Sequence, residues 1–387
     1  MYRRAGGNEQ RDARNPVLPA MVSMPHAVRK DLVHTKDTGT AHIASVAVAT
    51  PPFAIDQAEC ERLVRKHYEG KLNSRSLSLI RALLSHPSIK RRSFALDDIE
   101  CLLDEDLDAR VARFTRWALD LSSQAIRRSL AQARLDIADV AGLVVNTCTG
   151  YICPGISTYL IEKLGLSRSV RVYDLVGGGC GGAIPNLEIA QSLLARNGDT
   201  AVVSVSVEIC SATFQMENDL SLLLSNTLFG DGAAAAVLWT RPAGYELVAS
   251  ASRYVPEQRD TIRYVHRRGQ LYNQLSLKLP GLVARTVAEV VAEVLEPRML
   301  KPADIKHWAL HSGGEKVINA VRDEVGLSEE QVRATRTVLA EHGNMSSPTV
   351  WFVLREIERQ GISPGEWCIM AAFGAGLSAH AFLLRKR

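Results

Sequence analysis

The sequence predicts an α/β protein in which two similar halves pack around a largely buried sheet. Short β-rich segments alternate with helical segments along most of the chain, which is typical of sheets covered by helices. An internal repeat relates the two halves, because segment 138–147 (ADVAGLVVNT) matches segment 303–312 (ADIKHWALHS) at an offset of 165 residues. The composition agrees, since 46% hydrophobic and 23% charged residues are typical of a globular protein.

The individual elements can be assigned in chain order from residue periodicity. Residues 1–40 mix Arg, Asn, Gly, Pro and Asp without an apolar period and are expected to form a mobile tail. A strand is expected from His42 to the Pro-Pro pair, and apolar spacings of three and four predict helices at 56–68, 74–85 and 107–133. Further strands are expected at 141–148, 171–176, 200–209 and 233–239, with a helix at 183–196.

Two more matches extend the repeat and define the domain halves. The helix opened by Pro185 matches the helix opened by Pro348, and the strand after Gly198 matches the strand after Gly365. Any two strand-helix-strand units share such features, so coincidence is the alternative. A true repeat gives halves at 41–240 and 244–387 related by a pseudo-twofold axis, with equivalent strand and helix ends meeting at a central site.

Composition and charge argue against several classes of function. Lys and Arg exceed Asp and Glu by only 46 to 42, and most of this excess lies in residues 1–40, so the folded part lacks the basic stripe of a nucleic-acid-binding protein. No apolar run is long enough to span a membrane, and the first residues lack the apolar core of a signal peptide, so we expect a cytoplasmic protein without integral membrane contact. Seven cysteines without paired short spacings favour reduced thiols over disulfides or a metal site.

Cys180 is the strongest candidate for a nucleophile. It lies in LVGGGCGG (175–182), between an expected strand and an expected helix, where glycines allow a sharp turn and close approach of a substrate. The N–H groups of the helix start are expected to lower the pKa of the thiol. A structural turn is the simpler alternative, and a phosphate-binding loop is disfavoured because the segment lacks the Lys-Ser/Thr ending.

Two further glycine-flanked segments supply candidate partners for the thiol. His311 follows the strand-like WAL and precedes SGG, and Asn344 in HGNMSSP could donate an amide hydrogen bond to a developing oxyanion. A buried structural histidine and an ordinary helix N-cap are the alternatives. The order Cys, His, Asn also suits a papain-like protease, but such proteases carry their cysteine near the mature N-terminus in a different local motif.

Taken together, these segments resemble the type III polyketide synthases of the chalcone synthase superfamily over roughly residues 42–387. The resemblance implies a thiolase fold with a five-layered αβαβα arrangement, and the motif style is closest to bacterial alkylpyrone and alkylresorcinol synthases. In the segment FGAGL (373–377), Ala375 stands where many members of the family have proline, which should only loosen the loop. The matching motifs are the cysteine loop, EICSATF (208–214), LFGDGAAA (228–235), HSGG (311–314), GNMSSP (343–348) and FGAGL (373–377).

The resemblance also assigns roles to individual residues. It implies a catalytic triad of Cys180, His311 and Asn344, with Phe229 as the gate between a CoA tunnel and the active-site cavity. It places Asn273 where plant members usually carry a second aromatic gate, which would make the entrance wider or more polar.

Further residues are implied to contact the substrate or the partner subunit. Cys153 resembles the residue that reaches into the partner subunit's cavity, which implies a homodimer. A basic cluster at 90–92 resembles the family's CoA phosphate site, although a solvated charge run is the alternative. The implied substrate-binding residues are Cys148, Cys153, Cys210, Ser211, Thr213 and Ser346 at the cavity and Lys90, Arg91 and Arg92 at the CoA phosphates.

The implied reaction is a decarboxylative Claisen condensation. The Cys180 thiolate, paired with the His311 imidazolium, takes an acyl group from an acyl-CoA. Malonyl-CoA then loses carbon dioxide, and the resulting enolate, held by His311 and Asn344, attacks the thioester. No cofactor is required beyond the CoA thioesters that serve as substrates, and no metal. Small side chains on the expected cavity wall favour a fatty acyl starter and a pyrone or a resorcinol- or phloroglucinol-type product.

Two other functions fit the same fold. A ketoacyl-ACP synthase III-like enzyme also combines Cys, His and Asn but takes malonyl groups from an acyl carrier protein, and the GNMSSP segment with Phe229 favours the polyketide synthase instead. A non-catalytic thiolase-fold subunit would not need a thiol in a glycine loop, so the intact set of three residues argues against it.

Overall fold

The computed structural model describes residues 40–104, 106–195 and 200–387. Apart from Thr40, the tail expected over residues 1–40 lies outside the described residues. The helix expected at 107–133 is observed with those bounds, and the one expected at 74–85 ends one residue earlier. Among the described residues, no helix combines the length and the apolar character needed to span a membrane.

The bounds of the elements are as follows. The strands are β1 (His42–Ala49), β2 (Phe53–Asp56), β3 (Arg91–Phe94), β4 (Val140–Asn146), β5 (Arg171–Leu175), β6 (Ala201–Glu208), β7 (Gly232–Trp239), β8 (Tyr245–Tyr254), β9 (Ile262–Arg267), β10 (Gln270–Leu275), β11 (His307–Leu310), β12 (Trp367–Gly374) and β13 (Ser378–Lys386). The helices are α1 (Gln57–Tyr68), α2 (Ser74–Leu84), α3 (Cys101–Asp104), α4 (Leu107–Ala133), α5 (Ile156–Leu164), α6 (Ala183–Leu194), α7 (Leu220–Leu228), α8 (Leu279–Leu295), α9 (Glu315–Val325), α10 (Glu329–His342) and α11 (Thr349–Gln360).

The strand order of the main sheet shows that the chain consists of two similar halves. The order is β11-β12-β13-β8-β1-β7-β6-β4-β5. In one half, β1 pairs antiparallel with β7, β7 antiparallel with β6, and β6 parallel with β4. In the other half, β8 pairs antiparallel with β13, β13 antiparallel with β12, and β12 parallel with β11. The junction itself consists of the pairs His42 with Glu246 and Ile43 with Tyr245. This arrangement confirms the two related halves expected from the repeat.

Corresponding turns in the two halves also share their hydrogen bonds. Asp139 and Asp304 each end a short 3-10 helix that leads into a parallel strand, directly into β4 for Asp139 and after two further residues into β11 for Asp304. The Asp139 carboxylate accepts a hydrogen bond from the Asp136 N–H at 2.8 Å, and the Asp304 carboxylate accepts one from the Lys301 N–H at 2.7 Å. The repeated Ala-Asp motif therefore encodes the same strand entry twice.

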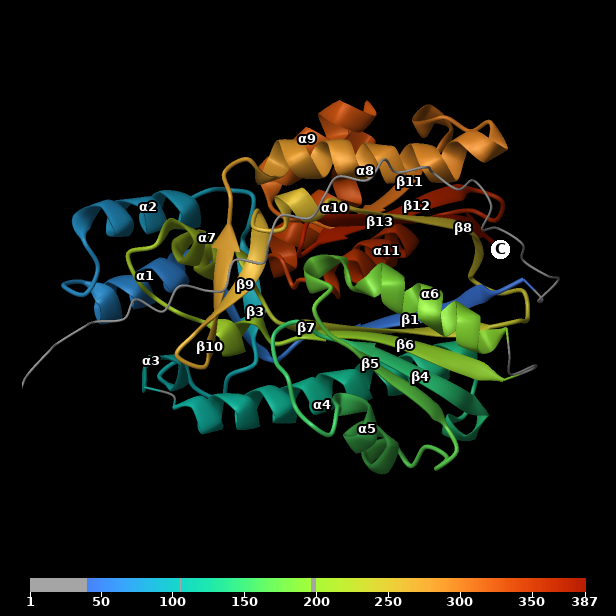
Figure 1. Cartoon of the computed structure of the whole chain (residues 1–387), viewed down its shortest axis with the longest axis horizontal. Helices are drawn as coiled ribbons and strands as arrows, with labels where there is room; N and C mark the ends of the chain where they lie inside the picture. Colours follow the sequence, from blue (N-terminus) through green and yellow to red (C-terminus); the bar gives the residue numbers. More distant parts are fainter. Residues whose placement is uncertain (1–39, 105, 196–199) are drawn as a thin grey trace, which may run out of the picture. The chain divides into compact units, whose positions relative to one another are not determined.

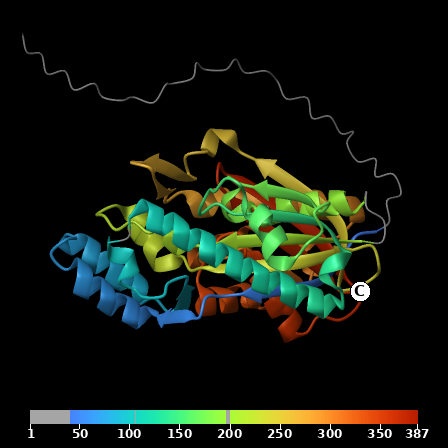
Figure 2. The same ribbon diagram turned by 90° about the horizontal axis from the view of Figure 1, so that it is seen from below.

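Helices separate and cover the two halves of the sheet in five layers (Figure 1). Helices α8 and α9 lie outside the C-terminal strands, α6 and α11 lie between the two halves, and α4 and α5 cover the N-terminal strands. Seen from below, α4 runs across the outer face of its strands (Figure 2). The observed order confirms the five-layered αβαβα arrangement.

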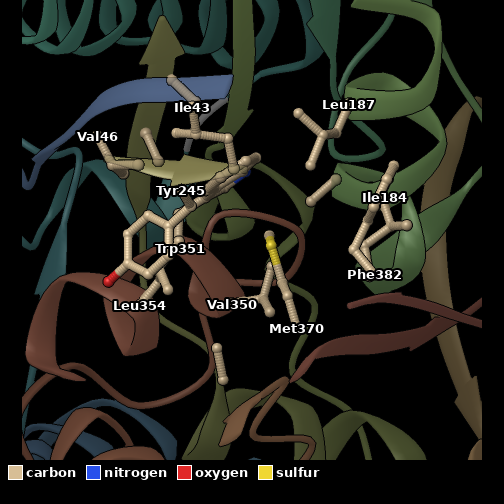
Figure 3. Close-up of a cluster of buried hydrophobic side chains, with 14 of the residues drawn as sticks. Ile43, Val46, Ile184, Leu187, Tyr245, Val350, Trp351, Leu354, Met370 and Phe382 are labelled. Carbon is tan, nitrogen blue, oxygen red and sulfur yellow. The ribbon is translucent and has the colours of Figure 1, made fainter. Parts of the chain in front are cut away.

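The central layer is held by large apolar side chains from both inner helices. Trp351 of α11 and Ile184 of α6 are fully buried in one cluster with Phe382 of β13 (Figure 3). The indole N–H of Trp351 donates to the Ser206 hydroxyl at 3.3 Å, so the ring is buried without leaving its polar atom unpaired. Burial of each such side chain contributes roughly 1.5–3 kcal/mol, and the cluster holds the two inner helices between the half-sheets.

A smaller group of elements adjoins one end of the layers. Helices α1 and α2 pack with α7, and the β9–β10 hairpin lies beside α7 (Figure 1). Ile80, Leu84 and Leu223 form the buried contact between these helices. This group matters for function because it borders the cavities described below.

Candidate active site

The cysteine loop is shaped by contact with a second glycine-containing loop. Cys180 is buried in a 3-10 turn between β5 and α6. The φ angle of Gly179 is +56°, and a Cβ there would be 2.8 Å from the Ala375 nitrogen. A Cβ on Gly374 would be 2.6 Å from the Gly181 nitrogen. The glycines therefore allow the two backbones to pack directly on each other, which explains why this cysteine lies in a glycine run.

Burial determines the protonation of the thiol in this conformation. Desolvation raises the pKa of Cys180 to about 12, against the opposing effects of the Ser346 hydroxyl and of the Cys180 backbone N–H. The lowered pKa expected from the helix start is therefore not found. Loss of hydration outweighs the few oriented N–H groups, because moving a charged group out of water is more costly than these dipoles can offset.

His311 is positioned by the end of β11 and by an aromatic ring. Its backbone N–H donates to the Ala371 carbonyl at 2.8 Å. Its ring packs edge to face on the Phe373 ring, with 4.9 Å between the ring centroids. Desolvation lowers the pKa of His311 to about 3, so the ring is neutral at pH 7. Within the described part of the chain, neither ring nitrogen has a hydrogen-bond partner. An unpaired buried imidazole is costly, which is consistent with a site that a ligand oxygen completes.

Asn344 and Phe229 are held side by side on adjacent backbone segments. They form a parallel bridge in which the Asn344 N–H donates to the Leu228 carbonyl at 3.0 Å and the Gly230 N–H donates to the Asn344 carbonyl at 2.9 Å. The Asn344 side-chain oxygen accepts from the Ser346 N–H at 2.7 Å. This bond fixes the orientation of the side-chain amide, with its oxygen toward the Ser346 N–H and its amino group pointing away from that N–H.

A small chamber of about 30 Å³ adjoins Cys180. Phe229, Cys148 and Ser346 line it together with the nucleophile, so the structure brings these predicted residues together. The Cys148 sulfur lies 3.4 Å from the Ser346 hydroxyl. His311 instead borders a separate small apolar cavity beside Phe373. The residue after Phe373, Gly374, packs on the cysteine loop.

Comparison with known proteins places this geometry in a family. Residues 65–262 match the family model described as FAE1/Type III polyketide synthase-like protein, and residues 246–386 match chalcone and stilbene synthases, C-terminal domain. A 3,5-dihydroxyphenylacetyl-CoA synthase of Streptomyces toyocaensis is 31% identical over 320 residues, which cover 79% of this chain and 82% of that protein. This chain belongs to the type III polyketide synthases. It is therefore an acyl-CoA-condensing transferase.

Solved structures of type III polyketide synthases share the fold. The 1,3,6,8-tetrahydroxynaphthalene synthase of Streptomyces coelicolor A3(2) superimposes with a TM-score of 0.83 at 24% identity, covering 90% of this chain and 99% of that one. PKS-I of the brown alga Ectocarpus siliculosus gives a TM-score of 0.83 at 26% identity, covering 92% and 100%. The thiolase fold predicted for this polyketide synthase is thereby confirmed.

A second, larger cavity of this polyketide synthase contains the other predicted wall residues. Cys210, Ser211 and Thr213 line a cavity of about 100 Å³ that extends between α1, α2 and α7. Its other walls are mostly apolar, including Leu63 and Ile80. Phe229 and Asn273 line both this cavity and the Cys180 chamber, so they stand between the two.

The basic cluster of the synthase is divided between surface and interior. The Lys90 and Arg91 side chains are 70% and 59% exposed, and both form ion pairs with Glu341. Arg92 differs from the expected phosphate contact, because it is 2% exposed and its guanidinium donates to the Phe229 carbonyl at 2.7 Å. Strand β3 has a period of two, so Arg91 points outward and Arg92 inward.

Cys153 lies away from the cysteine chamber. It is exposed and precedes Pro154 in a loop whose tyrosine, Tyr151, is 74% exposed. Among the described residues, Cys153 is not one of those that line the Cys180 chamber or the larger cavity, and its role toward a partner subunit stays a prediction.

Two site residues of the synthase were not identified from the sequence. Tyr264 lines the Cys180 chamber, pairs with Asn273 across the β9–β10 hairpin, and lies 3.3 Å from the Thr213 hydroxyl oxygen. Its only signal was an aromatic residue in a short strand of mixed character, and strand pairing was needed to place it.

Glu208 is the second residue, a fully buried carboxylate at the end of β6. It accepts hydrogen bonds from the Cys148 N–H at 2.9 Å, the Thr149 hydroxyl at 2.8 Å and the Ser347 hydroxyl at 2.7 Å. Burial raises the pKa of Glu208, while these donors lower it. The signal was a charged residue ending a strand that is otherwise uncharged and fully buried.

Proposed function

We propose that this synthase loads an acyl-CoA starter onto Cys180 and extends it with malonyl-CoA, using His311 and Asn344. The observation that carries the proposal is the meeting of three segments from different parts of the chain. The cysteine loop packs on the Phe373–Ala375 segment, Phe373 contacts the His311 ring, and Asn344 is bridged to Phe229 at the chamber wall.

The loading step begins from two neutral groups. With a thiol pKa of about 12 and an imidazole pKa of about 3, neither Cys180 nor His311 is charged at pH 7. We assign His311 as the base that takes the thiol proton as the sulfur attacks the acyl-CoA carbonyl. The tetrahedral adduct then expels the CoA thiolate, which takes the proton back from His311 and leaves as CoA. The acyl group remains on Cys180 as a thioester.

The extension step uses two neutral donors. The thioester carbonyl of malonyl-CoA would accept hydrogen bonds from a His311 ring N–H and from the Asn344 amino group. Breaking the bond to the carboxylate releases carbon dioxide and leaves an enolate, whose oxygen carries the charge that the donors stabilise. The enolate carbon attacks the acyl thioester and expels the Cys180 thiolate, which takes up a proton from water, the one proton that the decarboxylative condensation consumes. In a dry site these donors contribute more than they would in water.

The starter is proposed to be a fatty acyl group. The apolar cavity lined by Cys210 and Ser211 offers a place for a hydrocarbon chain beyond Phe229. Each buried methylene contributes about 0.8 kcal/mol, so affinity should rise with chain length until the cavity is full. Cyclisation of the extended chain would then give a pyrone or a resorcinol- or phloroglucinol-type product.

A homodimer in the cytoplasm is part of the same proposal. Tyr151, Tyr173 and Val176 are 74%, 47% and 60% exposed, although large apolar side chains are usually buried. Tyr151 lies two residues before Cys153, Tyr173 lies on the edge strand β5, and Val176 directly follows that strand. A second copy of the chain that packed against β5 would cover these side chains. Cys153 would then reach the partner's cavity.

Three substitutions test the assigned roles. Cys180→Ala should abolish product while malonyl-CoA decarboxylation continues in part, because decarboxylation depends on His311 and Asn344. His311→Ala should reduce both reactions, and Asn344→Ala chiefly the decarboxylation. Labelled malonyl-CoA measures both activities in one assay. Product formation by Cys180→Ala near the parent rate would remove the nucleophile assignment, and activity only with malonyl carried on an acyl carrier protein would favour a ketoacyl-ACP synthase.

A further inference from the structure

Arg92 is a buried cation that donates hydrogen bonds to two backbone carbonyls, to the Gln57 side chain and, at 3.4 Å, to the Cys60 sulfur. One guanidinium nitrogen, Nη1, donates to the Asn226 and Phe229 carbonyls, both at 2.7 Å. The Nε atom donates to the Gln57 side-chain oxygen at 3.0 Å. Burial lowers the pKa of Arg92, so keeping it charged here costs free energy that the hydrogen bonds must offset.

The carbonyls that Arg92 holds are those at the C-terminal end of α7. A helix leaves its last carbonyls without intrahelical partners and carries partial negative charge at that end. The Gln57 amino group donates to the Thr227 carbonyl at 3.2 Å, and the Asn344 N–H donates to the Leu228 carbonyl at 3.0 Å. With the two bonds from Arg92, each carbonyl from 226 to 229 has a donor.

The same arginine also touches the segment that carries Asn344. A Cβ on Gly343 would be 2.9 Å from both Cγ and Cδ of Arg92, so the arginine stem packs against this glycine backbone. Gly343 has a φ of +67° and directly precedes Asn344. The stem and the guanidinium thus contact both sides of the Phe229–Asn344 bridge.

We propose that Arg92 is a positioning residue for the Phe229 gate and the Asn344 amide. It fixes the backbone that carries both side chains, and its donors are directed at protein groups rather than at solvent. Exposed Lys90 and Arg91 are the members of the cluster that a CoA phosphate can reach. This inference rests on the proposed role of Asn344 in decarboxylation.

The test is the decarboxylation of malonyl-CoA by Arg92→Met, which keeps the stem and removes the hydrogen bonds. We expect kcat to fall about 10- to 100-fold, because misplacement of a reacting group by about 1 Å costs that much. We expect KM for malonyl-CoA to change less than about twofold. Malonyl-pantetheine lacks the nucleotide phosphates, and we expect kcat to fall equally with this substrate and with malonyl-CoA. Arg92→Lys should recover only part of the rate, because an ammonium cannot reproduce the planar arrangement of donors.

Comparison variants separate positioning from phosphate binding and from a general loss of stability. Lys90→Met and Arg91→Met should raise KM for malonyl-CoA alone. Arg92→Met could instead raise KM for malonyl-CoA as much as these two variants do, with no rise for malonyl-pantetheine. That result would make Arg92 a phosphate ligand and overturn the proposal. Leu160→Ala, in the buried core where α5 packs and outside the linings of both cavities, controls for lost stability and should leave kcat unchanged in the folded fraction.

Two further results decide the remaining cases. If Arg92→Met does not fold, Gln57→Met, which removes the support of the guanidinium, should lower kcat without raising KM, and an unchanged kcat would overturn the proposal. Asn344→Ala is the reference. If it lowers decarboxylation while Arg92→Met does not, the positioning role fails and the proposed function stands. If Asn344→Ala has no effect, the proposed function itself fails.

Discussion

Gly374→Ala should move the nucleophile without touching it. Gly374 ends β12 and faces the cysteine loop across a contact that has no room for a side chain. A Cβ at this position would be 2.6 Å from the Gly181 nitrogen and 3.0 Å from the Gly181 Cα, and it would also overlap the Gly178 carbonyl oxygen. These atoms are backbone, so rotation of a side chain cannot relieve the overlap.

The size of the effect follows from that geometry. Ordinary contact begins near 3.4 Å, so the loop must retreat by at least about 0.8 Å to relieve the 2.6 Å contact, and further to clear the Gly178 carbonyl oxygen. Overpacking of this kind typically costs about 1–3 kcal/mol of stability. A shift approaching 1 Å in a reacting atom can lower a rate by about 100-fold. We therefore expect acylation of Cys180 to slow by roughly 10- to 100-fold, with a lower melting temperature.

The assay is the rate at which labelled acyl-CoA transfers its acyl group to the protein, followed on the time scale of seconds. Gly326→Ala is the matched control, because Gly326 has a φ of +77° at the end of α9 but open space around it. Its backbone strain costs roughly 1–2 kcal/mol, so it lowers stability without moving the site. Acylation by Gly374→Ala at the parent rate, or an equal loss in both variants, would refute the reasoning.

The remaining predictions concern thiol titration and the starter. Because the pKa of Cys180 is about 12 and that of His311 about 3, alkylation of Cys180 by iodoacetamide should accelerate about tenfold per pH unit from about pH 7 to 10, without an inflection from the histidine. A rate already maximal at pH 7 would instead reveal a preformed thiolate–imidazolium pair. Rates with acetyl-, hexanoyl-, dodecanoyl- and coumaroyl-CoA should rise with aliphatic length, and Cys210→Phe should shift the preference to shorter starters with decarboxylation intact. A parent enzyme that prefers acetyl or coumaroyl groups, or an unchanged profile in Cys210→Phe, would contradict the fatty acyl starter.

For part of the chain, including α4, α6 and the strands β4 to β7, the order and type of the elements could be read from the sequence, because local patterns encode them. Apolar spacings of three and four placed α4 at its observed bounds, and the repeated Ala-Asp motif indicated the two related halves. The glycine-flanked motifs around Cys180, His311 and Asn344 singled out three loops, since glycine runs mark places where backbones approach closely.

The surroundings of those motifs were decided only by the tertiary structure. Arg91 and Arg92 are adjacent and chemically alike, yet one is exposed and the other is buried against the Phe229 carbonyl, because pairing of β3 with β2 sets which face each residue takes. Tyr264 enters the chamber because the hairpin register places it opposite Asn273.

The protonation of the site shows the same division. Sequence identifies a thiol near a helix start, where dipoles favour a thiolate, but the pKa of Cys180 rises to about 12 because the surrounding layers exclude water. Burial depends on every segment that covers the sulfur, including the Ser346 and Ala375 loops far along the chain. Local sequence determines which chemical groups are present and how their own backbone turns. Long-range packing determines which groups meet and how much water remains around them.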